Sequence, residues 1–184
     1  MLWIILAIVL LIAILIGYLV KTYNNIVAAY IRVDNSWSQI DVQLKKRFDL
    51  IPNLVKTVKS YSSFEKDTLE SVIKYRNQGQ SAKTVDEKIA SNNELTKSIN
   101  NLLLTVEAYP DLKANSSFLE LQRELKDLET KIAVSRQFYN DTVMLYNEKI
   151  VKFPSNIIAS ALGYNQRPYF AAEEGMDKAP EIEL

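Results

Sequence analysis

The most apolar stretch of the chain is a run of uncharged, mostly aliphatic residues from Leu2 to Val20. At about 1.5 Å of rise per residue, a helix of this length reaches roughly 28 Å, close to the ~30 Å hydrocarbon thickness of a bilayer. Trp3 and Tyr18 lie near its two ends, where amphipathic rings prefer the membrane–water interface. The pattern predicts a transmembrane helix over residues 2–20.

Two other interpretations of this run are a cleaved signal peptide and a buried core helix. A signal peptide has a basic region before its apolar stretch and a small-residue cleavage site after it. Here no Lys or Arg precedes the run, and Lys21-Thr22-Tyr23-Asn24 is a poor cleavage site. A core helix is rarely apolar on every face over such a length. Because Lys21 and Arg32 follow the run, the positive-inside rule places the following domain in the cytoplasm and a very short N-terminus outside.

Beyond the run, apolar residues recur every three or four positions, which predicts helices. The first stripe extends from Tyr23 to Leu44 without Gly or Pro, so the span is expected to continue into this helix. Asp49-Leu50-Ile51-Pro52 interrupts the pattern. A tight reversal near Phe48–Asp49 is the preferred interpretation, and one proline-kinked helix is the alternative. A second helix, with Asp49 as its N-cap and Pro52 in its first turn, would then fray at Asn77–Ser81.

Two capping-box motifs mark the starts of further helices. Thr84-Val85-Asp86-Glu87 opens a third helix, and Ser117-Phe118-Leu119-Glu120 opens a fourth. The fourth helix carries an unbroken heptad ladder, formed by Phe118, Leu121, Leu125, Leu128, Ile132, Ser135, Tyr139, Thr142 and Tyr146. It should end before Phe153-Pro154, and Ser155 should cap a short last helix closed by Gly163.

Four helices of similar length with short connections predict an all-α fold: an up-down-up-down antiparallel four-helix bundle after the transmembrane helix, with a short C-terminal helix. The expected domains are the span at 2–20, the bundle at 21–170 and an acidic, disordered tail at 171–184. In this topology the turns at Phe48–Pro52 and Tyr109–Lys113 share the end far from the membrane. A candidate surface for a protein partner therefore comprises Arg47, Asp49, Pro52, Tyr109, Pro110 and Asp111.

The segment Phe153–Phe170 is apolar and aromatic, and two placements fit it. It can pack across the open end of the bundle, or it can lie in the lipid interface. It has no Lys or Arg between Lys152 and Arg167, and interfacial helices normally carry a basic flank. Packing on the bundle, as a plug over the first and second helices, is therefore the preferred placement.

Composition removes much of the usual chemistry. The chain has 22 Lys/Arg, 22 Asp/Glu, no His and no Cys, which excludes the commonest general base, thiolate nucleophiles and disulfides. Asp34 and Asp41 are seven residues apart on one helix face, but bundle-type metal sites also use histidines. No phosphate loop or dinucleotide motif occurs, and Lys45-Lys46-Arg47 is too short for a nucleic-acid site. We predict no catalytic residue, no metal and no cofactor.

Trp37 is expected in the core. Buried polar positions that fix helix register are expected at Arg136, Asn140 and Asn147.

Several long strings resemble the LemA family of bacterial membrane proteins and cover nearly all of the part after the span. They include Tyr23-Asn24, Val33-Asp34-Asn35-Ser36-Trp37-Ser38-Gln39-Ile40-Asp41-Val42-Gln43-Leu44-Lys45-Lys46-Arg47, Asp49-Leu50-Ile51-Pro52-Asn53-Leu54-Val55, Val106-Glu107-Ala108-Tyr109-Pro110-Asp111-Leu112-Lys113-Ala114-Asn115, Phe138-Tyr139-Asn140-Asp141, Tyr146-Asn147, Phe153-Pro154 and Tyr169-Phe170. The resemblance implies an N-terminal anchor and an antiparallel helical bundle, and it implies no defined activity. Phe64 departs from it, standing where a histidine often precedes Glu65.

Together these patterns predict a membrane-anchored, non-enzymatic scaffold or adaptor at the inner face of a bacterial cell membrane. Its partners would be the membrane, crossed once, and another protein, for which the resemblance suggests a membrane-associated protease or scaffold. No nucleic acid is expected. Two alternatives remain open: a membrane-surface or lipid-remodelling module, and a cryptic enzyme based on carboxylates.

Overall fold

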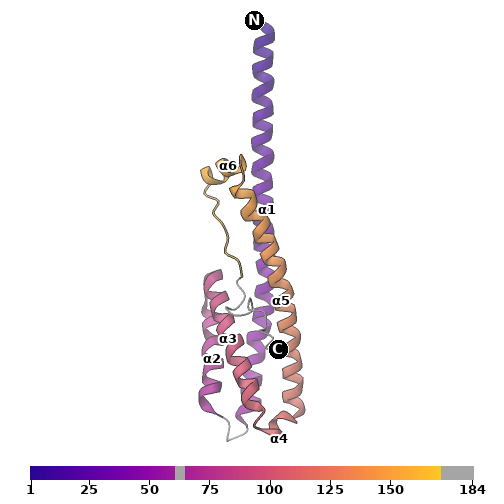
Figure 1. Ribbon diagram of the computed structural model, residues 1–184, viewed down its shortest axis with the longest axis vertical. Coiled ribbons are helices and arrows are strands. Elements are labelled where there is room, and N and C mark those ends of the chain that lie inside the picture. The colour runs from indigo at the N-terminus through magenta and orange to yellow at the C-terminus, as the bar shows by residue number, and fades with distance from the viewer. Residues whose placement is uncertain (61–64, 171–184) are drawn as a thin grey trace, which may run out of the picture. The chain divides into compact units, whose positions relative to one another are not determined.

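The computed structural model describes residues 1–60 and 65–170, and over these residues it is all-helical with no strand (Figure 1). The helices found there are α1 (Leu2–Lys59), α2 (Lys66–Ser81), α3 (Val85–Val106), α4 (Pro110–Lys113), α5 (Ser116–Val151) and α6 (Ser155–Ala161). The all-α fold class is confirmed. The expected tail at 171–184, like Phe64, lies outside the described residues.

The chain divides into two compact units, which we describe separately. The first unit combines Met1–Ser38 with Gln137–Tyr169, and the second combines Gln39–Arg136 with Phe170–Leu184. Both long helices, α1 and α5, therefore contribute to both units.

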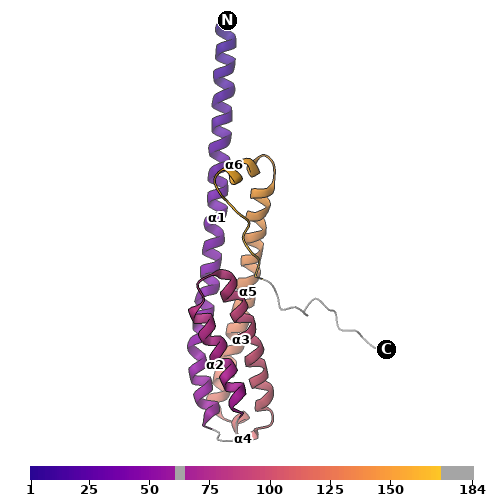
Figure 2. The ribbon, with the colours of Figure 1, turned by 90° about the vertical axis from the view of Figure 1, so that its left-hand side faces the viewer.

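The second unit is a bundle built from the end of α1, α2, α3 and the start of α5, with α4 between α3 and α5 (Figure 2). Successive helices run in opposite directions, as the short connections require. Apolar side chains from all four helices are fully buried inside it, among them Ile40, Leu44, Ile51, Leu54, Val72, Leu95, Leu102 and Phe118. The heptad ladder of α5 is confirmed, since all its members are buried except Ser135, which is half-buried.

The reversal expected near Phe48–Asp49 is wrong, because α1 continues through Pro52 to Lys59. Proline inside a helix removes one backbone hydrogen bond and costs about 3 kcal/mol. Here Pro52 is exposed, while Ile51, Leu54 and Val58 on either side of it are fully buried. Burial of this apolar stripe offsets the cost of the proline and keeps the chain helical through Lys59.

Gly79 allows α2 to approach α1 closely in the second unit. It is buried, and a Cβ added there would lie 2.6 Å from Cζ of the Phe48 ring, which is itself buried. The backbone of α2 therefore packs directly on this ring. Arg76 strengthens the contact, since its Nε donates a hydrogen bond to the carbonyl oxygen of Phe48 at 3.1 Å.

Replacing Gly79 with alanine should lower the free energy of unfolding by about 1–2 kcal/mol, because overpacking costs 1–3 kcal/mol and outweighs the helix propensity that alanine gains. Thermal unfolding of the full chain in detergent would measure this. The control is Gly79→Ala combined with Phe48→Leu, because leucine lacks the outer ring atoms that clash. A stabilised single variant would contradict the close approach.

The capping box predicted for the third helix is confirmed. The Thr84 hydroxyl oxygen accepts a hydrogen bond from the Glu87 backbone N–H at 3.2 Å, and the Glu87 carboxylate accepts one from the Thr84 N–H. Backbone N–H groups of Lys83 and Thr84 hold the pKa of Glu87 below its ordinary value.

The capping box predicted at Ser117 is wrong. Asn115 accepts the Phe118 N–H at 3.1 Å instead, so α5 begins at Ser116.

In the first unit, residues 21–38 of α1 pack against residues 137–151 of α5. Ile26 and Val33 from α1 and Tyr139, Val143 and Tyr146 from α5 are buried there. Trp37 is only half-buried, and its ring meets that of Tyr139 edge-on with 5.6 Å between centroids. The preceding residues 2–20 are exposed and apolar, with a mean hydropathy of 3.1 in the most apolar window, so α1 is long and apolar enough to cross a membrane.

After α5, the chain forms α6 and, beyond a turn at residues 162–163, returns along the first unit as an extended segment, residues 164–169. Gly163, with φ of 75°, closes α6 as expected. Ser155 does not cap α6; its hydroxyl donates to the carbonyl oxygens of Lys149 and Lys152 at the end of α5.

The plug prediction is wrong for most of α6 and its flanks. Phe153, Ile157 and Leu162 are exposed, and only Ala159 is fully buried. The reason is that a helix of seven residues covers its support with one face only, so the remaining faces of α6 stay exposed. Phe170, which belongs to the second unit, is buried with its ring 5.7 Å from the Arg136 guanidinium.

Candidate functional site: a groove beside the membrane span

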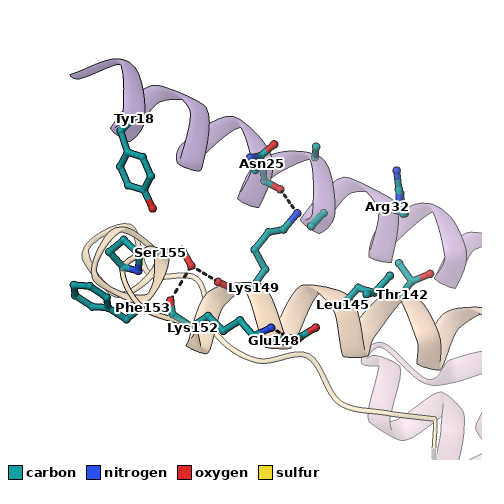
Figure 3. Close-up of a pocket in the computed structure, with 13 residues that line it drawn as sticks. Tyr18, Asn25, Arg32, Thr142, Leu145, Glu148, Lys149, Lys152, Phe153 and Ser155 are labelled. Carbon is teal, nitrogen blue, oxygen red and sulfur yellow. Dashed lines mark hydrogen bonds and ion pairs between the residues drawn. The ribbon is translucent and has the colours of Figure 1, made fainter. Parts of the chain in front are cut away.

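The first unit contains a groove of about 570 Å³ between α1 and the end of α5 (Figure 3). From α1 it is lined by Tyr18, Asn25, Ala28, Ala29 and Arg32, and from α5 and the start of α6 by Thr142, Leu145, Glu148, Lys149, Lys152, Phe153, Pro154 and Ser155. The two alanines leave room between the helices. Tyr18 lies at the end of the apolar run, so the groove begins where the candidate span ends.

Lys149 ties the two walls of the groove together. Its ammonium group donates a hydrogen bond to the backbone carbonyl oxygen of Asn25 at 3.3 Å (Figure 3). Figure 3 also shows the Tyr18 hydroxyl directed toward the turn that holds Ser155. The end of α5 and the start of α6 therefore lie beside the residues that follow the span.

The groove is basic. Arg32, Lys149 and Lys152 contribute three positive charges, and Glu148, paired with Lys152, contributes one negative charge. Among the residues that the structure describes, neither Arg32 nor Lys149 forms an ion pair with a carboxylate. The groove can therefore receive an anionic group at Arg32 and Lys149 without breaking an existing pair.

A second polar cluster in the first unit holds the extended segment in place. The Arg167 guanidinium lies 4.6 Å from the centroid of the Tyr30 ring and 3.1 Å from the Asp34 carboxylate. Asn147 clamps the backbone of Arg167, accepting its N–H at 2.8 Å and donating to its carbonyl oxygen at 2.9 Å. Asn147 is buried, so the interpretation of this residue as a structural polar position holds.

Among the described residues of the second unit, Arg47 is the most deeply buried cation, only 3% exposed. Its guanidinium donates to Asn92 at 3.0 Å and to Thr96 at 2.9 Å, and it pairs with the Glu129 carboxylate at 3.1 Å. These groups come from α1, α3 and α5, so one side chain links three helices of the bundle.

Asp41, also in the second unit, forms ion pairs with Lys88 and Lys45 at 2.5 and 2.9 Å. Partial burial by itself would raise the pKa of Asp41, but hydrogen bonds and charges from the two lysines outweigh it and hold the pKa below its ordinary value. Asp34 belongs to the first unit and pairs with Arg167. Both carboxylates that the sequence places on one helix face are thus engaged in ion pairs. No group of three potential metal-binding side chains occurs among the described residues.

Lys88→Met should lower the free energy of unfolding at neutral pH by about 1 kcal/mol, since hydrogen bonds to charged groups contribute about 1.5–3 kcal/mol and Lys45 retains part of the interaction. Because the folded-state pKa of Asp41 is lowered, this stabilisation is present above the unfolded pKa and is lost as the pH falls through the folded value. The difference between the two proteins, measured by denaturant unfolding against pH, should therefore shrink in acid. Lys66→Met, which removes an exposed pair with Glu70, is the control and should change little.

The six residues proposed as a partner surface do not gather at one turn. Arg47, Asp49 and Pro52 lie within α1, and Arg47 is buried, so it cannot contribute to an exposed surface. Pro110 and Asp111 are exposed in α4, and Tyr109 directly before it is half-buried. Asp49 and Pro52 are exposed on α1. A role for the exposed members in binding a partner stays a prediction.

Sequence reasoning missed the groove because its walls come from positions more than 100 residues apart in the chain. Arg47 did carry a detectable signal. It falls three residues after Leu44 and four before Ile51, on the same buried stripe of α1, so its spacing marks an inward position despite its charge.

The architecture and the apolar N-terminal helix define a membrane-associated, all-helical protein. The model of the LemA family matches residues 36–184, and the chain belongs to this family. Protein LemA of Metamycoplasma hominis is 27% identical, over 82% of this chain and 69% of that protein. Magnetosome protein MamQ of Magnetospirillum gryphiswaldense is 22% identical, over 83% of this chain and 65% of that protein. Magnetosome protein MamQ 2 of Paramagnetospirillum magneticum is also 22% identical, over 88% and 69%.

Proposed function

We propose that this protein is a non-enzymatic scaffold or adaptor that presents a helical bundle to another protein at the inner face of a bacterial cell membrane. The observation that carries the proposal is the continuity of α1 within the first unit. The candidate span passes without a break into the helix that packs against α5. A continuous helix, unlike a flexible linker, transmits the position of the membrane to the domain that follows it.

The polar interior supports the same function. The buried and half-buried ionic groups described above, those of Arg47, Asp41 and Arg167, are engaged in contacts between helices or with the extended segment. Lys21, directly after the span, and Arg32, further along the same helix, support a cytoplasmic bundle by the positive-inside rule. Relatives that are named as magnetosome proteins fit a role at a membrane.

For the partner surface we propose the exposed residues around α4, Pro110 and Asp111. They lie between α3 and α5 in the second unit, at the end of the bundle where α1 also ends (Figure 2). A turn of this kind is exposed on a rigid support, which favours recognition by another protein.

The test is photo-crosslinking in intact cells. A photoreactive amino acid at Asp111 should give a defined protein adduct, whereas the same group at Asn100, exposed on α3, should give none or a different one. If Asp111 gives no protein adduct under conditions in which the chain is membrane-bound, the partner surface is wrong.

Orientation has a separate test, because the chain contains no cysteine. A single cysteine at Asn77, exposed on α2, should react with a membrane-impermeant maleimide only after the cells are permeabilised. Reaction in intact cells would place the bundle outside.

A further inference from the structure

The exposed apolar surface of α6 and its flanks is large for so short a segment. Phe153, Ile157 and Leu162 are 79%, 61% and 53% exposed. On the supported side Ala159 is fully buried and Ile158 is half-buried, so α6 has a fixed orientation on the first unit. Its apolar residues therefore point outward because of how α6 packs, and an apolar surface of this kind marks an interaction site.

The position of α6 indicates what covers this surface. Phe153 and Pro154 line the same groove as Tyr18, which stands at the end of the apolar run (Figure 3). Tyrosines at this position in a span lie at the membrane–water interface. Since Tyr18 and the start of α6 belong to one unit, α6 lies at the depth of the interface when α1 spans the bilayer.

The charges beside α6 suit the headgroup layer. Lys149 is held against Asn25, five residues beyond Val20, and thus about 7.5 Å from the end of the run at ~1.5 Å per residue. The headgroup layer on each side of a bilayer is about 5–7.5 Å thick. Lys149 therefore lies at the outer edge of this layer, with Lys152 beside it in the lining of the same groove, and lysines there are attracted to anionic phospholipids.

We infer that α6 is a second membrane contact: Phe153, Ile157 and Leu162 enter the lipid interface beside α1, while Lys149 and Lys152 bind the phosphate groups of anionic phospholipids. The inference rests on the membrane span of the proposed function. The basic flank that interfacial helices need, which is absent from the sequence of α6 itself, is supplied by the end of α5. Together with the span in α1, this contact attaches the first unit to the bilayer at two points.

The test uses the full chain in vesicles, with single cysteines carrying an environment-sensitive fluorophore. Labels at Ile157 and Leu162 should be quenched by brominated phospholipids and protected from aqueous iodide. A label at Asn77, exposed on α2, should show the reverse. A label at Leu10 reports separately whether α1 is inserted, so failure of the span and failure of the α6 contact can be distinguished.

Two variants test the lysines in vesicles with and without phosphatidylglycerol. Lys149→Gln combined with Lys152→Gln should lower the ratio of docked to undocked α6 about thirtyfold in the anionic vesicles. Lys126→Gln combined with Lys131→Gln, which removes the same charge from exposed positions of α5 in the second unit, should leave the ratio unchanged.

Three outcomes would overturn the inference. The first is iodide access at Ile157 and Leu162 equal to that at Asn77, with the Leu10 label inserted. The second is protection in detergent that rises with protein concentration, which would assign the surface to contact between copies of the chain. The third is equal docking in neutral and anionic vesicles, which would remove the lysines from the contact.

Discussion

Arg47→Ala is expected to lower the free energy of unfolding of the second unit by about 3 kcal/mol. The substitution removes an ion pair and two hydrogen bonds at once. Asn92 is only 3% exposed, so its side-chain oxygen would be left buried without this donor, which by itself costs about 1–3 kcal/mol. Loss of the buried aliphatic stem adds to the effect. Denaturant unfolding of the full chain would measure the loss.

Two controls separate the causes of this loss. Arg47→Met keeps most of the packed volume but removes the hydrogen-bond donors, so it should recover part of the stability that Arg47→Ala loses. Lys46→Ala removes a neighbouring positive charge from an exposed position and should change stability by less than about 0.5 kcal/mol. In Arg47→Ala, amide hydrogen exchange should become faster in the parts of α1, α3 and α5 that belong to the second unit. Unchanged stability in Arg47→Ala would mean that the three-helix link carries no energy.

Local patterns predicted the helices of this protein well where local interactions decide them. The heptad ladder of α5 is buried as expected, because a repeat sustained from Phe118 to Tyr146 leaves one face for the core. The Thr84 box starts α3, because both of its hydrogen bonds form within four residues. The helix over the apolar run from Leu2 to Val20 is likewise predicted by the composition of the run alone.

The errors arose where tertiary packing outweighs a local signal, or where two local signals compete. Asp49 and Pro52 are typical of a helix start, but Ile51 and Leu54 continue a buried stripe, and burial keeps α1 helical through them. Ser117 has a capping-box spacing, but Asn115 is an equally good cap and begins the helix earlier. In the first case the sequence alone does not show that this part of α1 is buried. In the second case it offers two residues that can cap the same helix.

The groove could not be predicted for a different reason. Its lysines come from the end of α5, and Asn25 and Tyr18 come from α1. Nothing in either segment indicates that the other lies opposite, since the pairing depends on the register between two long helices. The sequence of α6 itself contains no basic residue, and the nearest lysines, Lys149 and Lys152, belong to the end of α5 and the turn after it.

The second large effect is expected at Tyr146 in the first unit. Its side chain is fully buried, its ring meets that of Tyr30 edge-on at 6.0 Å, and its hydroxyl donates to the carbonyl oxygen of Asn165 at 3.0 Å. Burial raises the pKa of Tyr146, and the positive charge of Arg167 offsets only part of this rise, so the hydroxyl keeps its proton and remains a donor. One residue thus packs the core and holds the extended segment.

Tyr146→Ala should lower the free energy of unfolding of the first unit by about 3–5 kcal/mol, through lost burial and the cavity left behind. Tyr146→Phe keeps the ring and removes only the hydrogen bond, so it should cost about 1 kcal/mol and mainly speed hydrogen exchange in residues 162–169. Tyr169→Ala, at a half-exposed ring in the same unit, serves as the control and should cost much less. If Tyr146→Phe were as damaging as Tyr146→Ala, the hydrogen bond to Asn165 and not the packing of the ring would hold the first unit together.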